Sequence, residues 1–485
     1  MPSSLDALSK NLAKDQFNET QLPPKESFFS ILNDEDISDD DYSHAQNVWI
    51  EFNCKTFGDY HDLHNVSDVL LLADVFENFR DVCMSCYNLD PAWYYKSPEL
   101  AWDAALKKKK KIELQSDYDM ILMIKKGIRG GIGMISNRLR TSNKQYMGDE
   151  YDQSKPSTFI QYLDANNLYG WALSKPLNMV DLEYPEHLRD EHNDYPLALE
   201  RLNIDKVEKL VPNLNNKKKG IKFEERAWLN EYIELNTNLR TKATNDFEKD
   251  FFKIMNDSVF GKTMENVENR VDIRLVTDRN EANKLASKPN FESRTIFDEN
   301  LIAIHMKRTK LLYDKPIYLG MCILDLSKTL MYKFHYDYIK KKYVDRAKLL
   351  FTDTDYLAYE IITEDFYADI SKDVENKFDT SKFNPKHTAI NKVGFIVGVN
   401  IKVIGMFKDE SGGAQIEEFV GLRLKLYSYK VHGKDYKKCK GVKKNVVKKY
   451  ITHGDYKDCL LNKRDHIRKI NVIRSYSHEI YTEEH

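Results

Sequence analysis

The sequence predicts an α+β protein, and three observations support that prediction. Apolar residues recur at helical spacing over residues 69–79, and residues 228–268 form a long periodic segment with one glycine and no proline. Strand-forming residues dominate residues 159–163 and both arms of KLLFTDTDYLAYEI, residues 348–361. The 485 residues contain no long linker and no repeat, so we expect one continuous body with soft domain boundaries.

The composition argues against several classes of protein. No apolar run approaches the roughly 18 residues of a membrane span. The N-terminus has neither a secretory apolar core nor an Arg-rich transit pattern, so we expect an intracellular protein, in nucleus, cytoplasm or mitochondrion, with no membrane contact. The six cysteines include one CxxC pair, Cys83 and Cys86, but no second pair, which favours free thiols over a zinc site.

The net charge of −2 conceals a gradient along the chain. Acids crowd NDEDISDDDY from Asn33, whereas lysines dominate YKKCKGVKKNVVKKY from Tyr436. A basic segment interleaved with tyrosines is typical of a surface that contacts nucleic-acid phosphates. A solvated lysine face explains the same pattern equally well.

The first half of the chain is expected to contain three kinds of element. Residues 69–79 form an amphipathic helix that packs in the core. KKGIRGGIGMISNRLR, from Lys125, is a glycine-rich loop that either brings the backbone close to a phosphate or forms a plain turn. Residues 159–163 form a strand with Asp164 at its end, followed by a turn or helix start.

The second half is expected to be helical and then β. Residues 228–268 form two helices, with Gly261 kept for a close approach. PIYLGMCILDLSKTL, from Pro316, forms a short strand and then a helix from about Leu324. Residues 348–361 form a β-hairpin with its two acids at or near the tip.

Acids on separate strands suggest two-metal phosphoryl transfer, in which two Mg²⁺ ions about 3.5–4 Å apart hold the attacking and leaving oxygens. Asp164 on one strand and Asp353 and Asp355 on the hairpin supply these acids. Mg²⁺ binds few carboxylates together with substrate phosphate oxygens, so no histidine is needed. Lys249 and Lys253, one helical turn apart, offer two amines to a triphosphate, although each alone would be an ordinary surface lysine.

Four motifs in a fixed order make the prediction more specific. DANNLYG, KIMNDSVFGK, FTDTDYL and GLRLKLY follow one another along the chain. In this order they resemble the polymerase core of family B DNA polymerases, and most closely the protein-primed branch of Maverick/Polinton transposons, linear plasmids and viruses. The resemblance covers essentially the whole chain. It implies a right-hand fold with an antiparallel-sheet palm, helical fingers, a small thumb and a truncated exonuclease-like (RNase H-like) N-terminal domain.

The first motif, DANNLY, would supply metal and nucleotide contacts. The resemblance implies metal ligands at the side chain of Asp164 and the carbonyl of Ala165. The backbone around Asn167 and Leu168 would hold phosphates, and Tyr169 would be the steric gate against a ribose 2′-hydroxyl.

The second motif would hold the incoming nucleotide. Lys253 would bind its triphosphate with Lys249 beside it, and the segment from Ser258 to Gly261 would face the nascent base pair. Asp257 stands where the family has Asn, and it adds a negative charge close to the phosphates.

The later motifs would hold metal and primer. Asp355 matches the second metal ligand and Asp353 the auxiliary acid, while Tyr356 replaces the usual Ser. Lys425 and Tyr427 match the family's Lys-x-Tyr motif, which steadies the primer terminus. The resemblance also implies primer–template contacts from a Tyr-x-Gly-Gly linker, whose glycines are Gly130 and Gly131 and whose Tyr is replaced by Ile128.

His64 and Asp68 match the third exonuclease motif, with His in place of Tyr. We expect no proofreading, because no strand upstream carries Asp-x-Glu and one acid cannot hold two metals. The expected regions are a partial exonuclease-like domain (1–126), palm and fingers (127–405), and a thumb with primer–template contacts (406–485). The stretch before FEERAWL and the end at EIYTEEH are shorter than in the family, so the chain resembles a partial or eroded copy.

The resemblance implies template-directed DNA synthesis, in which a primer hydroxyl attacks the α-phosphate of a dNTP and pyrophosphate leaves. The implied cofactors and partners are two Mg²⁺ ions, with Mn²⁺ as an alternative, a DNA primer–template, dNTPs and a terminal protein that primes replication of a mobile element, plasmid or virus. The alternative, favoured by Asp257, Tyr356 and His64, is a relic that folds and binds DNA without synthesis. A two-metal nuclease has less support, because it does not need the helix around Lys253.

Overall fold

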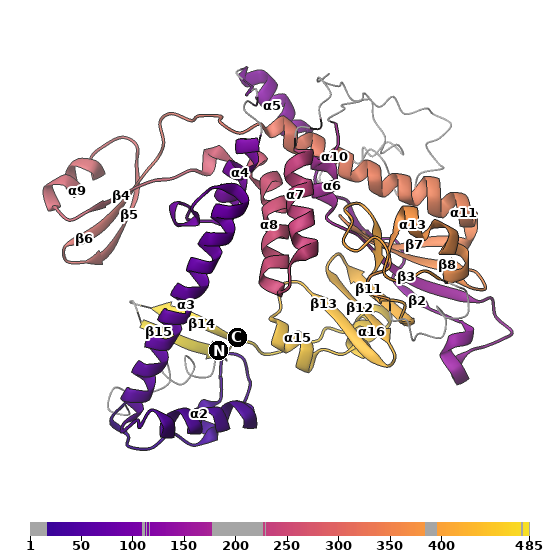
Figure 1. The fold of residues 1–485 in the computed structure, drawn as a ribbon, viewed down its shortest axis with the longest axis horizontal. Coiled ribbons are helices and arrows are strands. Elements are labelled where there is room, and N and C mark those ends of the chain that lie inside the picture. Colours follow the sequence, from indigo (N-terminus) through magenta and orange to yellow (C-terminus); the bar gives the residue numbers. More distant parts are fainter. Residues whose placement is uncertain are drawn as a thin grey trace.

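The computed structural model describes residues 17–108, 112, 114–115, 117–176, 227, 229–383, 395–476 and 479–484. Helices and strands are mixed along the chain (Figure 1), and every described strand pair is antiparallel except the edge pair β9–β10. The predicted α+β class is therefore confirmed. The stretch before FEERAWL that was expected to be short lies outside the described residues.

The helices and strands alternate in blocks of unequal length. The helices are α2 (Asp39–Glu51), α3 (Phe57–Tyr87), α4 (Ser97–Lys108), α5 (Tyr118–Gly127), α6 (Leu168–Leu173), α7 (Asn230–Lys242), α8 (Asp246–Thr263), α9 (Arg279–Ala286), α10 (Ile317–Tyr332), α11 (Lys341–Tyr343), α12 (Phe366–Ile370), α13 (Val374–Lys377), α15 (Lys444–Tyr450) and α16 (His453–Asn462). The strands are β1 (Gly133–Ile135), β2 (Leu139–Thr141), β3 (Thr158–Ala165), β4 (Asp272–Val276), β5 (Phe291–Asp298), β6 (Leu301–Met306), β7 (Ala347–Asp353), β8 (Tyr356–Ile362), β9 (Phe378–Asp379), β10 (Phe407–Asp409), β11 (Ile416–Arg423), β12 (Leu426–Val431), β13 (Lys434–Cys439), β14 (Asn471–Tyr476) and β15 (Glu479–Glu484).

A six-stranded sheet in the order β1-β7-β8-β3-β10-β9 forms the centre of the fold. Successive side chains of a strand point to opposite faces. On β3, Phe159 and Leu163 pack with Phe334 of the π-helical segment that continues α10, whereas Ile160 and Tyr162 pack with residues of β11 and β12. Both faces of the sheet are therefore covered, and Asp164 belongs to the face that looks toward β11 and β12.

The C-terminal region is joined to the centre by shared strands. Strand β10 pairs with β3, although it lies beyond the domain boundary expected at residue 405/406. In the other direction, β2 pairs with β11 to complete the four-stranded sheet β13-β12-β11-β2. The chain therefore does not divide at this boundary, because each expected region contributes a strand to the other's sheet.

The N-terminal region is helical. Its described residues between 17 and 126 form α2, α3, α4, α5 and short 3₁₀ turns, with no β-strand. An RNase H-like fold is built around a β-sheet, so this expectation is wrong for the described part of the region. Phe28, Ala45 and Phe57 instead form a small core where α2 meets the start of α3.

Helix α3 spans 31 residues and runs from α2 toward α4 (Figure 1). Its central apolar side chains were expected to be in the core, yet Val69, Leu72 and Phe76 are 66%, 68% and 39% exposed. Only the C-terminal end of the helix, with Cys83 and Tyr87, joins the core formed with α4, α7 and α8. Helical periodicity predicted the helix correctly but not its burial.

Helix α10 corrects the expectation of a short strand before a helix at about Leu324. It begins at Ile317 and is continuous to Tyr332. Leu319, Ile323 and most of the helix are buried, because α10 lies between α5, α6, α8 and the sheet. A short apolar run of this kind does not distinguish a strand from a helix that is buried on all sides.

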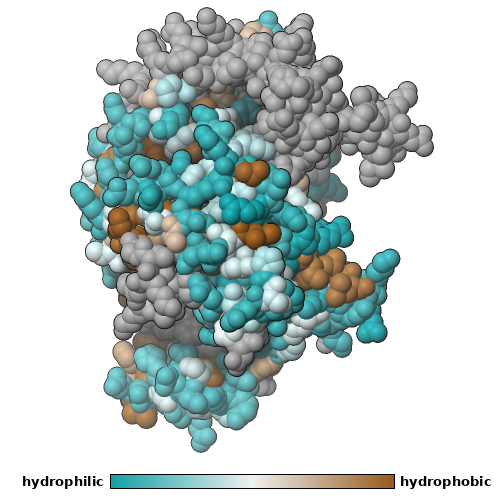
Figure 2. Space-filling view, turned by 90° about the vertical axis from the view of Figure 1, so that its right-hand side faces the viewer, coloured by the Kyte–Doolittle hydropathy of each residue, from teal (hydrophilic) through white to brown (hydrophobic). Residues whose placement is uncertain are grey.

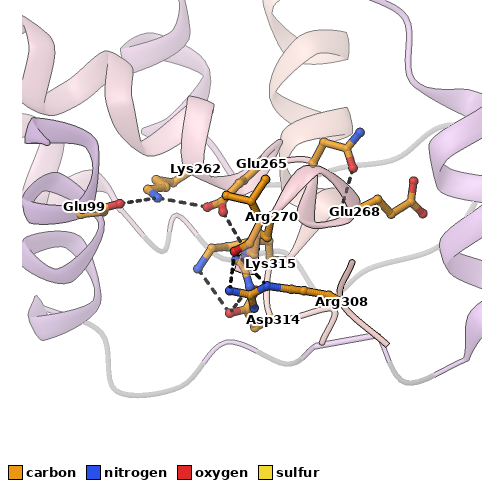
Figure 3. A network of polar contacts seen from close by, with 10 residues as sticks. Glu99, Lys262, Glu265, Glu268, Arg270, Arg308, Asp314 and Lys315 are labelled. Atoms are coloured by element: carbon orange, nitrogen blue, oxygen red, sulfur yellow. Dashed lines mark hydrogen bonds and ion pairs between the residues drawn. The ribbon is translucent and has the colours of Figure 1, made fainter. Parts of the chain in front are cut away.

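Strands β4, β6 and β5 with α9 form a small module that extends away from the rest of the chain (Figure 1). Its own core contains Val276, Leu285 and Ile304. A polar network ties its base to the helices (Figure 3). Arg270, just before β4, donates to Glu265 at 2.9 Å and to both carboxylate oxygens of Asp314 at 2.8 and 3.1 Å, which joins the two ends of the module.

The surface shown in Figure 2 is largely hydrophilic, with several separate apolar patches. Scattered apolar patches of this kind are normal for a folded protein. Among the described residues, none of the helices is both long and apolar enough to cross a membrane.

Candidate active site

The acids of the first and third motifs lie in one row across three strands. Asp164 on β3 is directly opposite Tyr356 on β8, and Tyr356 is directly opposite Asp353 on β7. Directly opposite residues of antiparallel strands project from the same face. The two acids therefore flank Tyr356 on the face that looks toward β11 and β12.

The turn of the hairpin brings Asp355 to the same place. Thr354 adopts a left-handed conformation (φ 63°), and the N–H of Asp355 donates to the carbonyl of Asp353 at 2.8 Å. The N–H of Ala165 donates to the carbonyl of Asp355 at 2.9 Å. The predicted hairpin with acids at its tip is confirmed, and a backbone hydrogen bond ties that tip to the residue after Asp164.

The acids share a buried, negatively charged environment. Burial raises the pKa of Asp355 to about 7, and Asp164 and Asp353 add to that rise, whereas Lys253 opposes it. Burial also raises the pKa of Asp164. Buried carboxylates with raised pKa values lack sufficient compensation by cations, so a bound cation would stabilise their charged forms.

The candidate metal ligands are oxygen atoms, which Mg²⁺ prefers, and they are few. Among the described residues there is no cluster of three or more His, Cys, Asp or Glu side chains arranged to hold a metal ion. Mg²⁺ usually binds one or two carboxylates and completes its coordination with water and substrate phosphates. Asp164 and Asp355, with the carbonyl of Ala165, match that preference for oxygen donors.

Two residues beside Asp164 were not predicted from the sequence. Lys408 lies directly opposite Asp164 on β10. Its ammonium group is 2.9 Å from Asp164 Oδ2 and 2.6 Å from Glu410 Oε1. The local sequence FKDE carries no signal for this contact, because the partners are 244 residues apart and meet only through strand pairing.

Helix α8 presents the lysines of the second motif. Lys253 is exposed on α8, and its charge lowers the pKa of both Asp355 and Asp257. Lys249, one turn earlier, pairs with Asp246 at 3.0 Å. The charge of Lys253 therefore acts on Asp355 and Asp257, while Lys249 has a partner of its own on the helix.

Arg240 and Lys402 add further positive charge near Lys249 and Lys253. Neither residue was predicted from the sequence. Burial lowers the pKa of Arg240, against the effect of Asp257, Asp250 and Asp164. Burial lowers the pKa of Lys402 too, and the charges of Arg240 and Lys249 add to that effect. Arg240 lies on α7 within a segment predicted to be helical, but the direction in which its side chain points depends on the packing of α7 against α8.

The start of α6 carries the rest of the first motif. Asn167 caps the helix in a left-handed conformation (φ 43°), and its side chain accepts from the N–H of Gly170 at 3.1 Å. Leu168 is buried. Tyr169 stacks on Phe260 of α8 with 4.3 Å between ring centroids. The stack connects the first and second motifs and places the predicted gate residue between the acids and the helix.

The neighbours of Asp257 complete the second motif. Burial raises the pKa of Asp257, and the charges of Lys253 and Arg240 oppose that rise. Ser258 is half-buried on α8. A methyl group added to Gly261 would meet no atom of the described residues within 4 Å, so this part of the chain makes no close approach there.

The C-terminal sheet brings the Lys-x-Tyr motif to the acids. Lys425, in the β11–β12 turn, has its ammonium group 3.7 Å from Asp353 Oδ1. The hydroxyl of Tyr427 is 2.9 Å from that of Tyr162, which lies two residues before Asp164 on β3. The motif therefore lies beside the acids, and its predicted contact with the primer terminus stays a prediction.

Tyr356 is accommodated by aromatic packing. Its ring centroid is 5.4 Å from that of Tyr162, within the core formed by β3, β7, β8, β11 and β12. The side chain is only half-buried. The replacement of Ser by Tyr therefore extends an aromatic cluster beneath the acids.

The predicted exonuclease residues lie elsewhere on the fold. His64 and Asp68 are one turn apart on α3, with His64 Nδ1 3.2 Å from Asp68 Oδ2. They pair with each other, and none of the described contacts connects them with the acids of the central sheet.

The sequence matches no protein-family model and no curated protein. Two solved structures of Phi29 DNA polymerase are similar to the chain. The ternary complex with primer–template DNA and incoming nucleotide substrates has a TM-score of 0.48 and 12% identity over 100% of this chain and 77% of that one. The post-translocation binary complex has a TM-score of 0.41 and 15% identity over 74% and 62%. With both TM-scores below 0.5, neither likeness assigns a fold or a function to this chain.

Proposed function

We propose that this protein is a DNA-directed DNA polymerase that extends a primer by two-metal phosphoryl transfer. The observation that carries the proposal is the meeting of acids from two separate segments, Asp164 on β3 and Asp355 at the hairpin tip, under the positive charge of Lys253. Carboxylates from separate strands facing a cationic helix suit a reaction between a hydroxyl and a triphosphate.

The proposed layout is a right hand. The six-stranded sheet is the palm, α7 and α8 are the fingers, and the C-terminal elements from β11 onward approach the primer–template. We place the chain in the protein-primed branch of family B on the four ordered motifs. A terminal protein as the source of the first hydroxyl, and a mobile element, plasmid or virus as the replicated DNA, belong to this proposal.

Positioning and charge would supply most of the rate enhancement. Asp164, Ala165 and Asp355 would hold two Mg²⁺ or Mn²⁺ ions, which when bound would stabilise the charge that develops on the attacking and leaving oxygens. Lys253 and Arg240 would bind the triphosphate from the fingers side. The charge of Lys253 acts on Asp355 and that of Asp164 on Arg240, so both cations would help to orient the α-phosphate toward the primer hydroxyl.

The remaining residues of the site would select and align the substrates. Tyr169 is held by its stack on Phe260, so the ring is rigid and able to exclude a ribose 2′-hydroxyl. Lys425 and Tyr427 would contact the primer terminus, since they adjoin Asp353 and the strand of Asp164. Asp353 would support the turn and add negative charge to the site.

Primer extension tests the proposal. Purified protein with a primed template, Mg²⁺ and dNTPs should extend the primer, and Asp355→Ala should abolish extension while DNA binding is retained. Gel-resolved extension and fluorescence anisotropy of labelled DNA measure the two properties separately. A folded wild-type protein that extends no further than Asp355→Ala would contradict the proposal.

The second candidate is a folded relic that binds DNA without synthesis. Asp257 favours it, because this buried carboxyl places negative charge beside Lys253 and Arg240, which are the proposed triphosphate ligands. Retained DNA binding without extension, in the wild-type protein and in Asp257→Asn alike, would favour the relic over the enzyme.

A further inference from the structure

The ammonium group of Lys408 lies between two carboxylates of the proposed active site. It is 2.9 Å from Asp164 Oδ2 and 2.6 Å from Glu410 Oε1. The three side chains are only 15%, 14% and 23% exposed, so water screens these contacts weakly. The contact is set by the fold, because Lys408 and Asp164 are paired in register on β10 and β3.

A cation in this position opposes the binding of another cation. One of the two oxygen atoms of Asp164 already accepts a charged hydrogen bond from Lys408. A divalent ion held by Asp164 would also experience the positive charge of the ammonium group across a partly buried site, where repulsion is stronger than in water. Metal binding and the Lys408 contact therefore compete for the same negative charge.

We infer that Lys408 is a built-in counter-ion that weakens metal binding at Asp164 and thereby sets the metal concentration that the site requires. This inference rests on the proposed function, because it takes Asp164 to be a metal ligand. Lys408 would not bind the metal ion itself. It is a positioning residue that acts through its contacts with Asp164 and Glu410. With it in place, the acids are partly neutralised before a metal ion arrives.

Lys382 provides a matched control. Its ammonium group is 3.8 Å from the other oxygen of Glu410, Oε2, and its side chain is 53% exposed. It therefore approaches the same carboxylate from solvent without contacting Asp164. If any lysine near Glu410 weakened metal binding, Lys382→Met and Lys408→Met would have the same effect.

Binding of Mn²⁺, followed by electron paramagnetic resonance of the free ion, tests the inference without catalysis. Lys408→Met should bind Mn²⁺ at least about tenfold more tightly than the wild type, because a full charge is removed from the site. Lys382→Met should stay within about twofold of the wild type, since exposed charges are screened. Lys408→Arg, which keeps the charge, should also remain close to the wild type.

The outcomes separate this inference from the proposed function. Equal affinities in Lys408→Met and wild type would overturn the inference alone and make the contact a structural ion pair. Weaker binding in Lys408→Met would also overturn it and would show that Lys408 orients Asp164 for the metal. If no variant binds Mn²⁺, the proposed metal site fails and the inference fails with it. Lys408→Gln gives a second neutral variant, with the same expected gain, if Lys408→Met does not fold.

Discussion

A methyl group on Gly131 would lie 2.6 Å from both Oγ1 and Cγ2 of Thr354, the residue between the two acids of the hairpin. Thr354 also donates its backbone N–H to the carbonyl of Ile132 at 2.9 Å. The glycine-rich loop was expected to approach a phosphate or to form a plain turn. In the structure its backbone packs against the turn that carries Asp353 and Asp355.

Gly131→Ala should therefore reduce catalysis through the placement of the acids. The added methyl group must displace Thr354, and a shift of about 1 Å in a catalytic group can lower the rate of reaction on the order of 100-fold. Steady-state primer extension should show the loss in kcat, with DNA affinity close to the wild type. Gly130→Ala is the matched control, since a methyl group there lies more than 4 Å from every atom in the part of the chain that the structure describes. Equal effects of the two substitutions would contradict this account.

Tyr356 should contribute more to stability than to the chemistry. Its ring packs on Tyr162, so Tyr356→Phe should keep both the fold and an extension rate within about threefold of the wild type. Tyr356→Ser removes the ring and should lower the free energy of unfolding by roughly 1–3 kcal/mol, as measured by urea denaturation. A large gain of extension rate in Tyr356→Ser would instead show that the ring crowds the acids.

Asp257→Asn should improve nucleotide binding. The carboxyl group of Asp257 interacts with Lys253 and Arg240, and its negative charge offsets the cations proposed to bind the triphosphate. Removal of that charge should lower KM for dNTPs by about three- to tenfold, with less change in kcat. Asp250→Asn, an exposed acid on the same helix that also influences Arg240, is the control and should change KM less. An unchanged KM for dNTPs in Asp257→Asn would show that the charge of Asp257 does not affect triphosphate binding.

Asp355 should make the fold less stable as pH rises. Burial raises its pKa to about 7 in the folded state, from an ordinary value of 3.8. Between these values the folded state binds the proton more strongly than the unfolded state, so stability falls as pH increases through this window. Asp355→Asn should accordingly raise Tm at pH 8 in the presence of EDTA and change it little near pH 4. Thermal unfolding followed by circular dichroism measures Tm for both proteins. An equal rise in Tm at pH 4 and pH 8 would contradict this prediction.

Lys144 should have the opposite pH dependence. Its side chain is fully buried, and its ammonium group has no hydrogen-bond partner among the described residues. Burial lowers its pKa to about 7, against the effect of Asp409 and Glu417. The unfolded state therefore binds more protons between about pH 7 and the ordinary lysine pKa of about 10.4, and stability rises with pH through that window.

Replacement of this buried amine by an apolar side chain should stabilise the protein. Lys144→Met should raise the free energy of unfolding by about 2 kcal/mol at pH 7, because the variant no longer buries an unpaired charge. The gain should shrink as pH approaches 10, because the folded wild type then buries a neutral amine and the unfolded state approaches its own lysine pKa of about 10.4. Urea denaturation at pH 7 and pH 10 measures this gain in the free energy of unfolding. A less stable variant at pH 7 would show that Lys144 pairs favourably with Asp409 or Glu417.

Local patterns in the sequence predicted the parts of the site that lie within single elements. The strand before Asp164, the break between α7 and α8, and the hairpin around Asp353 and Asp355 all follow from short-range periodicity and turn residues. The Lys-x-Tyr motif predicted a primer contact at Lys425, and the structure places its ammonium group 3.7 Å from Asp353 Oδ1. Such features depend on residues close together in the chain, whose preferences are visible locally.

Features that depend on distant pairing were not predictable in this way. Lys408 reaches Asp164 only because β10 returns to the edge of β3, and Arg240 faces Asp257 only because α7 packs against α8. The exposure of Leu72 on α3 was missed for the same reason, since periodicity shows which face is apolar but not whether another element covers it. The first half of helix α10 was missed because residues 317–324 are buried on all sides, which removes the amphipathic signal.

Asp353, Tyr356, Asp164 and Lys408 stand opposite one another on four adjacent strands. A slip of one residue in any of these pairings would turn a member of the row to the other face of the sheet, where it would meet the apolar core. The arrangement of the acids therefore depends on the correct register of all four strands. Replacement of side chains within the row would leave these strand pairings in place, so an intact sheet is not by itself a sign of an active site.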